Sequence, residues 1–346
     1  MQLVRRRPRC AHDDVPHSLS RPGRPDDRGR ADGVLAGVGG ERVCGRLWLV
    51  SGIIGLCVAV AGVWFITAPA RFASAEAQAV SDSGDAVRGK LVFAAGDCAS
   101  CHASPGQSDR LHLGGGLALA SPYGTFRAPN ISPDLADGIG NWTAKDLANA
   151  LLRGVSPDGR HYYPAFPYGS FAHMRHEDVQ DLMAYLRTLP AVKGRPPEHE
   201  LNLVFGIRRF VGFWKILYFK PGPIAADPAH DERWNRGRYL SEALAHCAEC
   251  HSSRDMFGGI KASTRYAGGQ DPVGAGFYPN ITAARLGDWS EPQLAEMLKT
   301  GTTPKHARVG SSMADVVTNT AMLPESDREA IAAFVKSLPS RPTPNP

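Results

Sequence analysis

The sequence predicts an all-α protein in which two similar helical domains follow one N-terminal apolar helix. Three observations support this class. An uninterrupted apolar run occupies residues 47–67, a short cysteine motif occurs twice, and the same order of helix signals accompanies each copy of the motif. Corresponding positions in the two halves are 147 to 150 residues apart. So regular a repeat indicates duplication of one structural unit.

The apolar run from Leu47 to Thr67 contains no charged side chain. A helix of this length spans about 30 Å, which is the thickness of the hydrocarbon core of a bilayer. Arg42 and Arg46 precede it, and the positive-inside rule therefore places the N-terminus in the cytoplasm. We expect a single-pass anchor in a bacterial inner membrane, with all later residues in the periplasm. The alternative is a signal peptide cleaved near Ala75, which would release a soluble periplasmic protein.

The repeated motif has the form C-x-x-C-H. It comprises Cys98, Cys101 and His102 in the first copy, and Cys247, Cys250 and His251 in the second. This is the attachment signature of c-type haem, in which two thiols form thioethers with the vinyl groups and the histidine ligates the iron. The copies are 149 residues apart, whereas the two cysteine pairs of a zinc ribbon are separated by about 15–20 residues. We therefore expect two covalently attached c-type haems and no shared zinc site.

Helix signals in the first half begin just before its cysteine motif. Residues 85–97 have helical character, and Thr143 with Asp146 predicts a capped helix that runs to residue 152 and ends at Gly154. A further helix is expected over residues 177–189.

The second half repeats these signals in the same order. Ser290 with Gln293 predicts a capping box for a helix that ends at Gly301. Ser326 with Glu329 predicts the start of the last helix, which Pro339 follows.

These patterns divide the chain into seven segments. We expect a disordered cytoplasmic tail (1–46), the anchor (47–67), a tether (68–83), a first domain (84–192), an aromatic-rich linker (193–230), a second domain (231–340) and a short tail (341–346). The linker carries many aromatic side chains, which are costly to expose, so we expect it to pack over one or both domains. Contact with a membrane surface is the alternative, because basic residues flank those aromatics.

Charge is distributed unevenly along the chain. The net charge is +5, and residues 1–46 contribute +4 of it through ten Arg against six Asp or Glu. The rest of the chain is close to neutral and carries no basic stripe of the kind that binds nucleic acid. We therefore expect no nucleic-acid partner.

Methionine is the usual sixth ligand of an electron-carrying c-type haem, because its soft sulfur favours ferrous iron. In the first half Met183 lies on the apolar face of a predicted helix, so a role in the core suits it better. Met174 lies in the loop before that helix, and we expect it to ligate the first haem iron. His173 and His176 are the rival ligands.

The second half offers more methionines. Met256 follows His251 too closely to reach the opposite haem face easily, and Met297 falls on a helix face. Met313 lies in what the sequence suggests is a flexible loop, and we expect it to ligate the second iron. Met322 and His306 are the alternatives.

Several repeated features make residues 84–340 resemble the tandem cytochrome c subunits of membrane-associated alcohol, gluconate and aldehyde dehydrogenases. These features are Arg88-Gly89 and Arg236-Gly237, the triplets Pro129-Asn130-Ile131 and Pro279-Asn280-Ile281, the segments Tyr163 to Tyr168 and Trp234 to Leu240, and His246-Cys247. The resemblance implies two class I cytochrome c domains with iron ligands His102, Met174, His251 and Met313. Two departures stand out. Members of the family often have three haems, and many have methionine where Phe166 stands here.

The expected function is electron transfer from a periplasmic or membrane dehydrogenase, through two haems, to a quinone, a cytochrome or a terminal oxidase. The alternative is a haem enzyme, either a dihaem peroxidase or a thiosulfate-oxidising cytochrome. A peroxidase needs an iron that can lose its sixth ligand, and a candidate methionine for each iron argues against it. We expect no catalytic residues outside the haem sites, and the protein contributes ligation, burial and orientation.

Overall fold

The computed structural model describes residues 39–72, 78–271 and 276–344. The chain divides into two units, residues 1–60 and residues 61–346. Residues 1–38 of the expected disordered tail and the expected cleavage site at Ala75 lie outside the described residues. Residues 39–46, which were expected to belong to that tail, are instead helical and form the start of α1.

The N-terminal apolar run forms one long helix, α1 (Gly39–Ile66). Its stretch Trp48–Ile66 has a mean hydropathy of 2.4, and none of it is buried against other parts of the protein. By length and composition this stretch could cross a membrane. Thr67, the last residue of the expected anchor, follows the helix and is buried.

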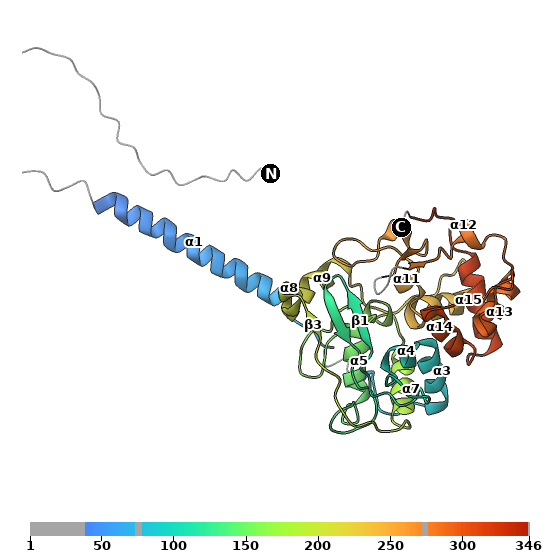
Figure 1. Cartoon of the computed structure of the whole chain (residues 1–346). Coiled ribbons are helices and arrows are strands. Elements are labelled where there is room, and N and C mark those ends of the chain that lie inside the picture. The colour runs from blue at the N-terminus through green and yellow to red at the C-terminus, as the bar shows by residue number, and fades with distance from the viewer. Residues whose placement is uncertain (1–38, 73–77, 272–275, 345–346) are drawn as a thin grey trace, which may run out of the picture. The chain divides into compact units, whose positions relative to one another are not determined.

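The described part of the second unit is built mainly from helices (Figure 1). Its larger apolar cluster includes residues from both halves. The first half contains α3 (Ala86–Ala95), α4 (Cys98–His102), β1 (Ala118–Ser121), β2 (Gly124–Arg127), α5 (Ala144–Arg153), α6 (Tyr168–Phe171) and α7 (His176–Leu186). The second half contains α10 (Glu232–Tyr239), η2 (Leu240–Leu244), α11 (Cys247–Cys250), η3 (Ala262–Thr264), β4 (Gly269–Gln270), β5 (Phe277–Tyr278), α12 (Ala283–Leu286), α13 (Glu291–Thr300), α14 (Ser312–Thr320) and α15 (Glu325–Lys336).

Two small antiparallel sheets add to the helices that the sequence predicts. Strands β1 and β2 form a hairpin, and β3 (Glu200–Leu201) from the linker joins its free edge. Strands β4 and β5 pair in the second half. These strands are only two to four residues long, and so short a segment carries little periodicity in the sequence.

The first and last helices of each half cross at a glycine. A Cβ added to Gly89 of α3 would lie 1.9 Å from the carbonyl oxygen of Asp181 in α7. A Cβ on Gly237 of α10 would lie 1.8 Å from the carbonyl oxygen of Ala330 in α15. The helices can therefore approach this closely only because these positions lack a side chain.

The arginine before each glycine secures the same crossing. The Arg88 guanidinium donates hydrogen bonds of 2.6 and 2.9 Å to Asp181, whose side chain is almost completely buried. Arg236 donates bonds of 2.9 and 2.8 Å to Asp327. The repeated Arg-Gly pair therefore combines close packing with a two-point ion pair in each half.

One inserted residue distinguishes the second half. Nine residues separate Arg88 from Cys98, and ten separate Arg236 from Cys247. The structure accommodates the extra residue in the π-helix η2, where the amide of Ala245 donates to the carbonyl of Leu240. A π-turn takes up one residue without ending the helix, so the cysteine motif keeps its place relative to the helix crossing.

Most of the predicted helix ends are confirmed. Thr143 with Asp146 and Ser290 with Gln293 form complete capping boxes, and α5 and α13 end at Gly154 and Gly301. Helix α7 begins at His176, close to the expected residue 177, but it ends at Leu186, three residues before the expected 189.

The predicted capping box of the last helix is wrong. Helix α15 already begins at Glu325, directly after Pro324, so Ser326 lies inside the helix and does not cap it. Proline fixes a backbone φ that suits the start of a helix, and that effect sets the boundary here.

Residues 193–230 form a packed connection. Besides β3 they contain α8 (Leu203–Gly206), η1 (Arg208–Phe210) and α9 (Val211–Tyr218). The Lys215 ammonium donates to the carbonyls of Arg153 and Gly154 in the first half, and the Tyr218 hydroxyl donates to Asp255 in the second. The expected packing over the domains is confirmed for this inner side of the linker.

Candidate functional site

Each cysteine motif forms a single turn of helix, α4 or α11. In such a turn the two cysteines, three residues apart, lie on the same face, as attachment to one porphyrin edge requires. Asp97 and His246, the residues just before the motifs, have positive φ values of 53° and 40°. This sharp change of direction separates each attachment turn from the helix before it.

The four motif thiols are free in the described chain and mostly shielded from solvent. Burial raises the pKa of Cys98 and of Cys250 to about 12, and that of Cys101 and of Cys247 to about 11. Before haem is attached, these groups are therefore protonated thiols at neutral pH.

The histidine of each motif is oriented by a backbone carbonyl. Nδ1 of His102 lies 2.8 Å from the carbonyl oxygen of Pro129, and Nδ1 of His251 lies 2.7 Å from that of Pro279. A carbonyl oxygen can only accept, so Nδ1 carries the proton and donates. The lone pair of Nε2 is then available for a metal, which is the usual arrangement of a ligating histidine.

Burial also favours the ligating form of these histidines. Desolvation lowers the pKa of His102 and of His251, and the bond to the proline carbonyl opposes it only in part. Both imidazoles are consequently neutral at pH 7, as iron ligation requires.

The Pro-Asn-Ile triplets hold those carbonyls in place. Asn130 donates to the carbonyls of Val192 and Gly194, and its own oxygen accepts from the amide of Ser132. Asn280 makes the equivalent bonds to the Arg341 carbonyl and the Thr282 amide. Each buried asparagine thus ties the triplet to the chain that follows the last helix of its half, and a satisfied buried network of this kind is rigid.

In the first half, the structure places Met174 in the loop between α6 and α7, as expected. Only 4% of its surface is exposed, and it belongs to the same apolar core as Cys98 and Phe171. The rival His173 is held to the linker, because its Nδ1 lies 2.6 Å from the Gly222 carbonyl. His176 packs edge-on against the ring of Phe72.

In the second half, Met313 lies in the first turn of α14 and not in the loop that the sequence suggested. It is half-buried and stands four residues before the buried Val317, so the two side chains share a face of the helix. The alternatives are more open: Met322 is 45% exposed, Met256 is 82% exposed, and His306 is exposed.

The two attachment turns lie at the contact between the halves. The amide of Asn319 in α14 donates to Asp97 and to the Ser100 hydroxyl, and Arg110 pairs with Asp315 of the same helix. Burial at this contact raises the pKa of Asp97. This cluster was not predicted from the sequence, because contacts between residues more than 200 positions apart leave no local pattern.

Comparison with known proteins agrees with this geometry. The cytochrome c family model matches residues 86–190. A diheme cytochrome c-type protein of Cereibacter sphaeroides is 49% identical over 261 residues, which cover 75% of this chain and 87% of that protein. The chain belongs to the cytochrome c family.

Other relatives of this cytochrome are longer proteins. The fructose dehydrogenase cytochrome subunit of Gluconobacter japonicus is 38% identical over 260 residues, 73% of this chain and 52% of that subunit. The alcohol dehydrogenase (quinone) cytochrome c subunit of Gluconobacter oxydans is 32% identical over 285 residues, 78% of this chain and 58% of that subunit. The cytochrome thus spans just over half the length of these two relatives.

Membership establishes covalently bound c-type haems with iron and electron transfer through them. The residues present fit such a group, because each motif combines two free thiols with a neutral imidazole. The Nδ1 of that imidazole bonds to the proline carbonyl, and its Nε2 is left available for iron. When bound, the haem supplies the redox chemistry, while the cytochrome contributes ligation, burial and orientation.

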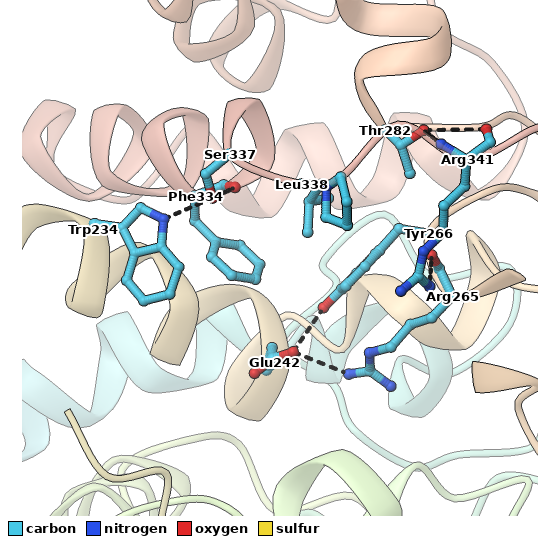
Figure 2. Close-up of a pocket in the computed structure, with 10 residues that line it drawn as sticks. Trp234, Glu242, Arg265, Tyr266, Thr282, Phe334, Ser337, Leu338 and Arg341 are labelled. Carbon is cyan, nitrogen blue, oxygen red and sulfur yellow. Dashed lines mark hydrogen bonds and ion pairs between the residues drawn. The ribbon is translucent and has the colours of Figure 1, made fainter. Parts of the chain in front are cut away.

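A separate pocket of about 240 Å³ lies in the second half of the cytochrome (Figure 2). The Glu242 carboxylate at its edge accepts from Arg265 and from the hydroxyl of Tyr266, and Trp234 donates to Ser337 across the far side. Charged and polar groups around the pocket therefore pair with one another.

Proposed function

We propose that this cytochrome is the membrane-anchored, two-haem electron-transfer subunit of a dehydrogenase. The observation that carries the proposal is the duplicated site, in which each Cys-x-x-Cys-His turn has its histidine fixed to a proline carbonyl. Two equivalent sites next to the contact between the halves suit passage of electrons from one haem to the other. The proposed haem domains are residues 84–192 and 231–340.

The proposed iron ligands are His102 with Met174 and His251 with Met313. Burial of Met174 in the apolar cluster against which Cys98 also packs supports the first pair. Met313 is preferred to Met322 because Met313 lies on the face of α14 that carries the buried Val317, whereas Met322 is 45% exposed. Methionine ligation of both irons would raise their potentials, which suits a carrier and disfavours a peroxidase.

A dehydrogenase is the proposed electron donor, because several relatives bear the names of fructose, alcohol and gluconate dehydrogenase cytochrome subunits. A quinone, a cytochrome or a terminal oxidase is the proposed acceptor. We place the haem domains in the periplasm, with Trp48–Ile66 spanning the inner membrane, on the strength of the length and hydropathy of that helix.

Haem stoichiometry and ligation test the proposed sites directly. Protein made in a host that matures c-type cytochromes should have the mass of the chain plus two haems. The double variant C98S/C101S should lose one haem, C247S/C250S should lose the other, and C57S should keep both. Bare polypeptide in the wild type, or a high-spin ferric spectrum for either haem, would contradict the proposal.

Membrane fractionation tests the anchor separately. The mature protein should stay in the membrane fraction after a carbonate wash and should retain its N-terminal segment by intact mass. A soluble product that begins near Ala75 would show that the segment is a cleaved signal, while leaving the haem sites untouched.

A further inference from the structure

The outer side of the linker is an exposed apolar surface, which we call the linker patch. It consists of Leu203, Val204, Phe205, Ile207, Phe210, Phe213, Ile216 and Leu217. Leu203 is 89% exposed and Leu217 is 60% exposed. Outside α1, most of the large apolar side chains that are exposed in the described residues gather here. A surface of this kind marks a binding site for an apolar partner.

Contacts on the inner side of the linker hold the linker patch in place. On the inner side of the same segment Val211 is buried, and the Tyr163 hydroxyl of the first half donates to the Phe205 carbonyl over 2.9 Å. Lys215 and Tyr218 add the bonds to the two halves described above. The apolar side chains therefore face outwards because the inner face of the segment is already occupied.

A loop of the second half extends the apolar surface. Met256 is 82% exposed and Phe257 is 60% exposed. The Tyr123 hydroxyl donates to the Met256 carbonyl over 3.4 Å, and the Tyr123 ring packs 4.7 Å from that of Phe205. This places the loop next to the linker patch, so that both halves contribute to one apolar surface.

The C-terminal end of α1 lies directly beside the linker patch. The Arg209 guanidinium stacks over the Trp64 ring at 4.0 Å and donates to the Trp64 carbonyl. Gly212 packs on Thr67, and the carbonyl of Thr67 lies 2.9 Å from Nε2 of the buried His161. The linker patch therefore lies next to Thr67, the residue that follows α1.

We propose that the linker patch rests in the outer leaflet of the same bilayer that α1 spans, with phospholipid as its occupant. This inference rests on the proposed anchor. A helix that crosses the bilayer leaves it at Thr67, and the linker segment packed against Thr67 then lies at the level of the headgroups. Apolar side chains of short helices enter the acyl boundary there, and exposed Lys220 and half-exposed Arg209 can meet lipid phosphates.

Lipid photo-crosslinking of the full chain tests the proposal. The wild-type holoprotein is placed in nanodiscs that contain phosphatidylcholine with a diazirine on its acyl chain. After illumination, lipid adducts are mapped by mass spectrometry. We expect adducts on α1, on residues 203–217 and on Met256 or Phe257, several-fold above those on Leu135. Leu135 is a matched control because it is 67% exposed and is not part of the linker patch.

The possible outcomes separate the inference from the proposed anchor. Adducts on α1 alone would overturn the inference and leave the anchor standing, and a protein partner would then be the occupant to seek. Adducts nowhere would overturn both, and adducts on Leu135 equal to those on the patch would overturn the inference as non-specific. The variant L203E/L217E should lose patch adducts several-fold relative to α1, whereas L135E should not.

Discussion

At the scale of single residues, the haem sites depend on groups that do not touch the iron. The carbonyls of Pro129 and Pro279 orient the ligating histidines, and Asn130 and Asn280 hold those carbonyls. The sequence shows the triplets as a repeat, but it does not show which atom of the triplet acts. A carbonyl is common to every residue type, so a role played by the backbone leaves no trace in composition.

Replacing Met174 with alanine should lower the potential of the first haem. Loss of the methionine sulfur would remove the proposed ligand that favours ferrous iron, and the expected fall is on the order of 100 mV within the ~0.8 V range that axial ligands control. The measurement is a potentiometric titration followed in the visible spectrum. M183L is the control, because Met183 is a buried core residue of the same half. An unchanged titration in M174A would remove Met174 from the site.

Because Lys215 is buried, the free energy of unfolding should rise as the pH increases above 7. Burial lowers the pKa of Lys215 to about 7 in the folded protein. In the unfolded chain the pKa of a lysine is about 10.4, so the unfolded state binds more protons between these values. The free energy of unfolding should therefore increase by no more than about 2 kcal/mol from pH 7 to pH 9.

Chemical unfolding at a series of pH values, followed by haem absorbance, checks this dependence. K215M should show a flatter profile than the wild type, and K220M should keep the wild-type slope because Lys220 is exposed on the same linker. Parallel profiles for wild type and K215M would refute the assignment to Lys215.

At the scale of elements, the helix crossings leave no space for an added side-chain atom. A methyl group on Gly89 would lie 1.9 Å from a backbone oxygen of α7, and backbone cannot move away cheaply. We expect G89A to lower the free energy of unfolding by about 1–3 kcal/mol or more, as overpacking does. G206A is the matched control, since nothing lies within 4 Å of a Cβ built there. Equal stability of the two variants in chemical unfolding would contradict the close approach.

Local chemistry explains which elements the sequence predicts well. The capping boxes at Thr143 and Ser290 lie within four residues of the helices that they start, so their signal is complete in the sequence. Strand β3 pairs with β2 from 75 residues away, and Met313 lies on a helix where a loop was expected. Those features depend on tertiary packing, which a short window of sequence cannot contain.

At the scale of the whole molecule, helix α14 joins the second half to the first attachment turn. We expect N319A to lower the free energy of unfolding by about 1–3 kcal/mol, because it deprives the half-buried Asp97 carboxylate of a donor. D315A on the same helix should cost no more than about 1 kcal/mol, since the Arg110–Asp315 pair is well exposed to solvent. Guanidinium unfolding followed at the haem absorbance compares them. A larger fall in the free energy of unfolding for D315A than for N319A would contradict this prediction.

The segment after α1 packs against the rest of the molecule. The sequence suggested a tether over residues 68–83, yet in its described part Phe72 and Arg71 bond to Asn149 and Ser156 of the first half, and Val80 is buried. Thr67, the residue that follows α1, is also enclosed by His161 and Gly212, so the chain is packed against the first half and the linker from this residue onwards. Residues 67–72 therefore belong to the packed surface of the second unit. A redox partner that approaches this side would meet ordered chain and not a flexible tether.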